Sequence, residues 1–217
     1  MSSDFPRSPK IRKGGLAAYR LPSLLPTIIV FQYNPEEVSR SIQARGAQGG
    51  GRGESQRTGG PPSETLTFTV EIDAADQLEF PAQNAQTVSM GLHPAIAALE
   101  SLTLPSFPLV AANETMALAG MSFIAAENAP LTLLIWGRHR VLPVKVESLT
   151  IKEQAFDTSL NPIRVSVDMS LKVQTYRDLE VTNPGYWVYM ASFAQKEVLA
   201  GSNTIGSASA IADLLPI

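Results

Sequence analysis

The chain contains no cysteine among its 217 residues. It therefore has no disulfide framework, no thiolate metal site and no cysteine nucleophile. This absence fits a reducing compartment. Histidine is scarce too: only His93 and His139 are present, and neither has a second histidine at the i, i+4 spacing of a metal site. We expect both histidines to be surface or capping residues.

Motifs that carry catalysis or bind cofactors are also missing. The sequence has no GxSxG, Walker-type or GxGxxG pattern before a plausible helix, and its GGGRG run has the composition of a linker. An acidic set could offer oxygen ligands to calcium or a carboxylate pair for hydrolysis: Glu71, Asp73, Asp76 and Glu79. It lacks the glycine and the alternating spacing of a calcium loop, so we interpret it as a solvated strand end followed by a turn. The sequence thus predicts no catalytic residue, no metal and no cofactor, and the chain is not expected to be an enzyme.

Long apolar runs are absent. The N-terminal residues MSSDFPRSPKIRKGG lack the apolar core of a signal peptide. The longest apolar run, LPSLLPTIIVF (21–31), is interrupted by two prolines and is too short to span a bilayer. We expect synthesis and assembly in the cytoplasm, without an export signal of the chain's own and without stable membrane insertion.

Charge is unevenly distributed along the chain. Residues 1–60 hold nine Lys/Arg and four Asp/Glu (net +5), and residues 61–217 hold eight and sixteen (net −8). A basic N-terminal part on an acidic body could bind nucleic acid or a membrane. We favour a plainer interpretation, in which it pairs with the acidic flank of a neighbouring subunit or is solvated, and we expect no nucleic-acid partner.

Two long segments have the period-two pattern of β-strands with one apolar and one polar face. In PIRVSVDMSLKV (162–173) the apolar residues alternate with polar ones from Ile163 onward, and in TLTFTVEID (65–73) they alternate without interruption. Eleven residues at about 3.3 Å each span about 36 Å, roughly twice the usual strand length. The polar positions of the two segments are Thr65, Thr67, Thr69, Glu71, Asp73, Arg164, Ser166, Asp168, Ser170 and Lys172.

Shorter segments complete the predicted secondary structure. A first strand is expected over 27–33, with an extended continuation over 36–43, and a hairpin follows 131–136 with its turn at Gly137-Arg138. The apolar positions of the second arm change from even to odd numbers between Val146 and Leu149, which predicts a bulge or a bend there. Helices are expected over 92–102 and 183–200. Residues 103–128 are expected to be mostly loop, with a short helix near 115–121.

These elements predict a mainly β (α+β) protein with one packed helix and a C-terminal helix. We expect an N-terminal arm over 1–26, a β domain over 27–180 and a C-terminal helix and tail over 181–217. The C-terminal helix is expected to present Trp187, Ala191, Ala194 and Val198 on one side. Residues 46–60, with seven glycines, are predicted to form a flexible loop between two strands.

Several of these segments together resemble the tube-protein family of contractile injection systems. They are FQYNPEEVSRSI, PPSETLTFTVEIDAADQLE, HPAIAALESL and LLIWGRHRVLPVKVESLTIKEQAFDTSLNPIRVSVDMSLKV, within residues 27–178. FQYNPEE (31–37) and FDTSLNPIRVSV (156–167) are the most specific, and the closest likeness is to the tube initiator, or spike adaptor, of the baseplate. The resemblance implies a β-barrel or sandwich, six copies of which form a ring around a channel.

The resemblance also implies partners and roles. The expected partners are other copies in a hexamer, inner-tube rings, a trimeric spike hub and further baseplate components of a phage-tail-like particle. The ten polar positions of the two long strands become candidates for the channel wall, and the 46–60 loop, with Arg45, Arg52 and Arg57, becomes a candidate contact to an adjacent ring. Relatives often carry a peptidoglycan-binding LysM module after the tube domain, which is not evident here. Two alternatives stay open: another inner-tube layer of the same particle, and a cell-wall or carbohydrate-binding β-sandwich module.

Overall fold

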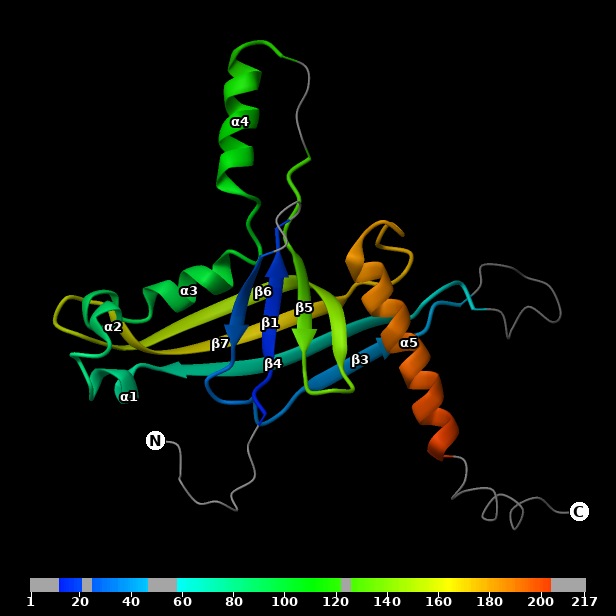
Figure 1. Cartoon of the computed structure of the whole chain (residues 1–217), viewed down its shortest axis with the longest axis horizontal. Coiled ribbons are helices and arrows are strands. Elements are labelled where there is room, and N and C mark those ends of the chain that lie inside the picture. The colour runs from blue at the N-terminus through cyan, green and yellow to red at the C-terminus, as the bar shows by residue number, and fades with distance from the viewer. Residues whose placement is uncertain (1–11, 21–24, 47–57, 122–125, 204–217) are drawn as a thin grey trace, which may run out of the picture.

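Most of the chain forms one antiparallel sheet flanked by helices. The computed structural model describes residues 12–20, 25–46, 58–121 and 126–203. Seven strands are hydrogen-bonded in the order β2-β1-β5-β6-β7-β4-β3, which leaves β2 and β3 at the two edges (Figure 1). The expected mainly β, α+β class with a C-terminal helix is confirmed. The strands are β1 (Gly15–Tyr19), β2 (Pro26–Val30), β3 (Ser39–Gln43), β4 (Ser63–Asp73), β5 (Leu131–Ile135), β6 (Val141–Phe156) and β7 (Pro162–Val173).

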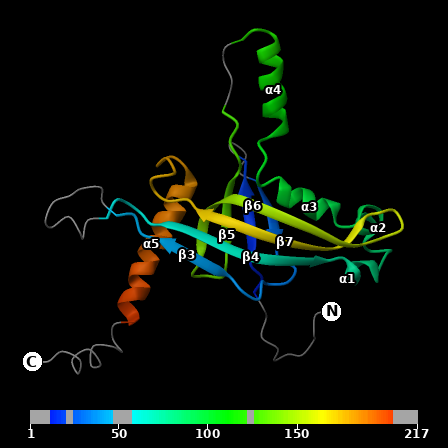
Figure 2. The same ribbon diagram turned by 180° about the vertical axis from the view of Figure 1, so that it is seen from behind.

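The helices lie around the sheet rather than in one layer. Helices α1 (Ala75–Leu78), α2 (Ala85–Met90) and α3 (His93–Glu100) follow β4, and α5 (Pro184–Asn203) lies at the opposite end of the sheet. Helix α4 (Phe107–Leu118) stands away from the sheet in both views (Figures 1 and 2). None of the helices in the described part of the chain is long and apolar enough to cross a membrane.

The core lies between the two halves of this curved sheet. Strands β1, β2 and β5 cross the long strands β4, β6 and β7 at a steep angle (Figure 1). Rings from both halves meet there, with the Phe31 and Phe68 centroids 5.6 Å apart and the Phe68 and Trp136 centroids 6.2 Å apart. Helix α3 covers the same core with Ile96 and Leu99. The long strands therefore bury most of one face within the fold, although Ile72, Leu149 and Ile151 on that face are only half-buried.

The bulge predicted between Val146 and Leu149 is confirmed. The pairing of β6 with β7 shifts register between Val146 and Ser148. Before the shift β6 pairs with β5 through Val141–Val144, and after it β6 pairs only with β7. The bulge thus lies where the strand changes from one half of the sheet to the other.

Two expectations need correction. The N-terminal arm expected over 1–26 does not hold for Gly15–Tyr19, which forms β1 between β2 and β5 and buries Leu16 and Ala18. Its small residues hid it, because Gly and Ala rank low in β propensity. The stretch expected to be mostly loop, with a short helix near 115–121, holds the longer helix α4, whose Pro108 suits the first helical turn.

The expected C-terminal helix is confirmed as α5. Trp187, Ala191, Ala194 and Val198 lie on one side of it, as expected, and all four are exposed.

Candidate functional site

The ten polar positions predicted on the two long strands form a single ladder. Strands β4 and β7 are antiparallel neighbours, and each predicted residue of one lies directly opposite a predicted residue of the other. We call this set the polar ladder. Its five pairs are Thr65 with Lys172, Thr67 with Ser170, Thr69 with Asp168, Glu71 with Ser166 and Asp73 with Arg164.

The ladder is polar because its apolar neighbours point into the core. Between the ladder residues, Leu66, Val165, Val167 and Leu171 are each at most 1% exposed. The ladder residues themselves are half-buried or exposed. A one-residue slip in register would bring hydroxyls and charges into the core, so the hydrophobic pattern fixes the pairing.

Charges on the ladder are mostly neutralised by neighbouring side chains. The Arg164 guanidinium donates from Nε to Asp73 Oδ2 at 2.8 Å. Asp168 accepts from Thr69 Oγ1 at 2.7 Å and from Lys152 Nζ at 2.8 Å. These two bonds, with that from Lys152 the stronger influence, hold the pKa of Asp168 below its usual value. The pKa of Asp73 is lowered by the backbone N–H of Ala75 and, next, by Arg164.

The polar surface continues onto both flanking strands, which the sequence analysis did not include. On β6, Ser148, Thr150, Lys152 and Gln154 lie opposite ladder residues of β7, and on β3, Ser39 and Ser41 lie opposite Thr67 and Thr65. The signal for β6 was present in the sequence, since these residues alternate with Leu149 and Ile151 after the bulge. Four strands therefore share one polar face.

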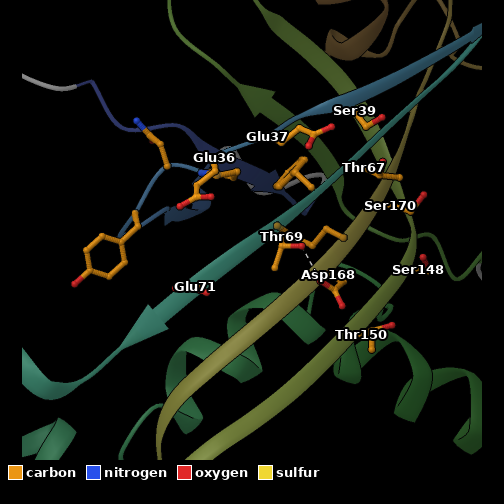
Figure 3. A pocket seen from close by; sticks show the side chains of 15 residues that line it. Glu36, Glu37, Ser39, Thr67, Thr69, Glu71, Ser148, Thr150, Asp168 and Ser170 are labelled. Atoms are coloured by element: carbon orange, nitrogen blue, oxygen red, sulfur yellow. Dashed lines mark hydrogen bonds between the residues drawn. The ribbon is translucent and has the colours of Figure 1, made fainter.

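A shallow hollow of about 770 Å³ lies on this face. Its floor includes Thr67, Thr69, Ser170 and Asp168, and its rim includes the segment 33–37 that leads into β3 (Figure 3). Three carboxylates at the hollow, those of Glu36, Glu37 and Glu71, have no ion pair among the described residues. The hollow is thus rich in hydroxyls and mildly negative. No cluster of three metal-ligating side chains occurs in the described ranges.

The loop between β3 and β4 is closed at its base. Gly46 and Thr58 form an isolated antiparallel bridge, and the Gly59 N–H donates to the Arg45 carbonyl at 2.7 Å. Arg45 is exposed at this base. Arg52 and Arg57, the other two residues of the predicted contact loop, lie outside the described residues.

A buried carboxylate that the sequence analysis missed lies on the core side of β4. Glu64 is 5% exposed and accepts from Arg40 Nε of β3 at 2.6 Å and from Lys196 Nζ of α5 at 3.2 Å. Burial raises its pKa, but the bond from Arg40 and the charges of Lys196 and Arg40 outweigh burial, so the pKa is lowered. The sequence could have indicated this burial, because Glu64 has an even number in β4, as the core residues Leu66, Phe68 and Val70 do. Glu64 joins two strands and a helix.

Comparison with known proteins does not assign the chain to a family. The chain matches no protein-family model, and no curated protein matches it. Its function is therefore argued from the geometry above and from the resemblance of the quoted segments.

Proposed function

We propose that the chain is a structural subunit of a contractile injection system baseplate. Six copies form a ring that joins the spike hub to the inner tube and initiates assembly of that tube. The observation that carries the proposal is the polar ladder, in which ten polar side chains form five consecutive pairs on one face while the other face is core. Such a face suits the wall of a water-filled channel.

The edges of the sheet support assembly. Among the described residues, strands β2 and β3 each have a neighbouring strand on one side only, so the backbone groups along the other side have no strand partner there. Edge strands of this kind pair readily with another chain, and closing a ring of identical subunits removes the exposed edges. Edge β2 also exposes Ile28 and Val30, which are 66% and 59% accessible. Burial of these side chains against a neighbour would favour the ring.

The projecting helix α4 supports a second type of contact. Phe107 and Leu118, at its two ends, are 81% and 89% exposed, and Glu114 is its single charged residue. Two strongly exposed apolar side chains on a helix that projects from the sheet are compatible with a surface that another protein covers. The proposed partners are inner-tube rings, a trimeric spike hub and other baseplate components. In this proposal the protein is made and assembled in the cytoplasm and becomes part of a phage-tail-like particle.

The chemistry of the polar ladder suits a channel through which cargo passes better than a site that binds a ligand tightly. Asp73, Asp168 and Lys172 each have an oppositely charged neighbour, so most ladder charges are neutralised, and Glu71, which has no ion pair among the described residues, leaves the face mildly negative. Hydroxyls of serine and threonine supply the rest of the wall. Cargo would pass along such a surface without strong electrostatic binding to it.

Ring formation is tested by light scattering after size exclusion, followed by negative-stain imaging, with the chain alone and with a spike hub. The expected result is six-membered rings or incorporation into a sheathed particle. A chain that stays monomeric in both conditions and is captured by peptidoglycan would reject the proposal in favour of a cell-wall-binding module. The aromatic residues of α5 give that alternative little support, because they do not form one exposed cluster. Trp187 is exposed, but Tyr189 is 8% exposed and packs against Tyr176.

The channel wall can be tested by thiol labelling, because the chain has no cysteine of its own. Thr67→Cys places a thiol on the polar ladder, and Gln86→Cys places one on α2, which takes part in none of the proposed contacts; both positions are exposed in the single chain. In the assembled ring stack, we expect a small maleimide to label both, whereas a polymer-linked maleimide too large for the channel labels only the α2 variant. Equal labelling of both variants by the large reagent would place the ladder outside a channel.

A deletion tests the loop between β3 and β4. Replacing residues 47–57 by a two-residue Asn-Gly turn shortens the hairpin and lets Gly46 and Thr58, which are already paired, stay opposite each other. We expect the deletion variant to fold, as judged by an unchanged circular dichroism spectrum and melting temperature, but not to stack on an adjacent ring. Normal stacking would reject the contact role of Arg52 and Arg57.

A further inference from the structure

Helix α4 and the returning segment 126–130 form a projection from the sheet, which we call the α4 arm and define as residues 104–121 and 126–130. The arm contains two carboxylates, Glu114 and Glu127, and no Lys or Arg. Asn113 Nδ2 donates to Glu127 Oε1 at 3.0 Å and ties its two segments together. Four of its large apolar side chains are 55%, 81%, 89% and 57% exposed: Leu104, Phe107, Leu118 and Met121. The single chain thus exposes an apolar, mildly acidic surface to water.

The α4 arm leaves the sheet at one end of the short strands β1, β2 and β5. At this end Tyr19 lies opposite Leu131. The next residue, Arg20, donates to the carbonyls of Ser101 at 2.9 Å and Leu104 at 3.3 Å at the foot of the arm. From there α4 points past β6, in the direction in which the long strands follow one another (Figures 1 and 2). Its 12 residues span about 18 Å, nearly four strand spacings, so the arm extends well beyond the sheet.

The other end of the same short strands is basic. Val30 and Ile135 lie there, both opposite Gly15, and are 59% and 40% exposed. Tyr33, three residues after Val30, is 50% exposed. Four cations adjoin these positions in the chain, and none of them has an ion pair in the ranges that the structure describes. We call this set, with the three apolar or aromatic residues, the basic end; its cations are Arg12, Lys13, Arg138 and Arg140.

We propose that the α4 arm of each subunit packs on the basic end of the next copy around the ring. This contact rests on the proposed ring and supplies it with a defined pair of surfaces. Strands β1, β2 and β5 cross the long strands steeply (Figure 1), so their two ends face the two neighbours of a subunit whose long strands line the channel. Contacts between two different patches of identical subunits run head to tail, and they close into a ring when the rotation between subunits allows it.

Charge favours a second copy as the occupant. Glu114 and Glu127 give the α4 arm a charge of −2, whereas the four cations give the basic end +4. Glu36 and Glu37, on the rim of the nearby hollow, reduce this to +2. Opposite charges across an interface steer two copies together and disfavour a contact of one arm with another arm. The exposed apolar side chains of both surfaces would leave water in the same contact.

Cross-linking between copies tests the contact, because the chain has no cysteine of its own. Leu118→Cys places a thiol on the α4 arm, Lys13→Cys places one on the basic end, and Gln86→Cys, the control, places one on α2; all three positions are exposed. The variants are mixed in pairs before assembly and treated with a short bis-maleimide. We expect covalent dimers of the arm and basic-end variants to form about tenfold faster than those of the arm and α2 variants, because only the first two thiols are held together.

Light scattering on the same samples separates this contact from the ring itself. Six-membered rings with equal cross-linking in the test and control mixtures would overturn the arm contact and leave the proposed ring standing. Dimers formed mainly between two arm thiols would assign the α4 arm to a symmetric pairing and would also overturn it. Chains that stay monomeric, both alone and with a spike hub, would overturn the arm contact together with the proposed function.

A second pair of variants measures the strength of the contact. Phe107→Asp with Leu118→Asp places two carboxylates on the α4 arm, and Val88→Asp with Met90→Asp, the matched control, places two on exposed apolar positions of α2. We expect the arm variant to keep the melting temperature of the single chain, because its two side chains are 81% and 89% exposed. Its dissociation constant for self-association should rise about tenfold, the scale of a lost interface anchor, and that of the control should not change. An unchanged constant, or equal weakening in both variants, would overturn the arm contact.

Discussion

Replacing Leu171 with alanine should lower the free energy of unfolding by about 3 kcal/mol, the usual cost of removing a large aliphatic side chain from a packed core. Leu171 is completely buried on β7, where it pairs with Leu66 of β4 on one side and Val146 of β6 on the other. These are the central strands of the sheet, so their backbones cannot close readily around the missing atoms. Denaturant titration of purified protein measures the change.

Leu160→Ala is the matched control for this substitution. Leu160 is 77% exposed in the turn between β6 and β7, so removal of its side chain loses little buried surface. Its φ of +64° disfavours leucine and alanine alike, so this strain cancels in the comparison. We expect a change below about 0.5 kcal/mol. A Leu171→Ala effect no larger than that of the control would contradict the placement of β7 at the centre of the core.

The sequence alone predicted the two long strands because their pattern is strict. An unbroken alternation of apolar and polar residues has one solution that buries the apolar set, so strand, face and register follow together. The ten ladder residues were therefore assigned to the correct face before their pairing was known. That they lie opposite one another depends on β4 and β7 being neighbours, although the described part of the chain between them holds four helices and two strands. No local pattern encodes that adjacency.

The parts that sequence analysis missed depend on tertiary contacts. Strand β1 consists of GLAAY, which has neither β-branched residues nor alternation, and it is a strand because β2 and β5 flank it on both sides. The sequence pattern of α5 did not assign its packed face, because the exposed side that carries Trp187 is more apolar than the side that packs on the sheet. Gly185 lies within the contact, where a Cβ would come 2.7 Å from Leu131 Cδ1, so a small residue there marks the packed side. Apolarity alone does not identify which face meets the sheet.

Glu64→Gln should lower the free energy of unfolding by about 2 kcal/mol at pH 7, the scale of a lost hydrogen bond to a charged group. The substitution keeps the size of the side chain but removes the charge that Arg40 and Lys196 share. Both cations are partly exposed and can be solvated, which limits the loss to less than that of a fully buried pair. Glu71→Gln, on the exposed polar ladder without an ion pair, is the control and should change stability little.

The pH dependence of this difference follows from the lowered pKa of Glu64. A carboxylate whose pKa is lower in the folded than in the unfolded chain stabilises the fold at any pH above its unfolded value, here about 4.5. Below that pH the unfolded chain takes up the proton first, so the contribution falls as the pH drops toward the folded pKa. The stability difference between the wild type and Glu64→Gln should therefore be constant from pH 7 to about 5 and shrink below 4.5.

Comparing the two proteins removes the contribution of other carboxylates. Asp73, Asp157 and Asp168 also have lowered pKa values, so both proteins lose stability in acid. Only the part that differs between them belongs to Glu64. Because Glu64 contacts Lys196 of α5 as well as β3, the substitution should also speed amide exchange in the turn of α5 around Lys196 without changing exchange in α3. A difference that persists undiminished at pH 3 would mean that the charge of Glu64 does not hold these three elements together, and that its side chain contributes through packing alone.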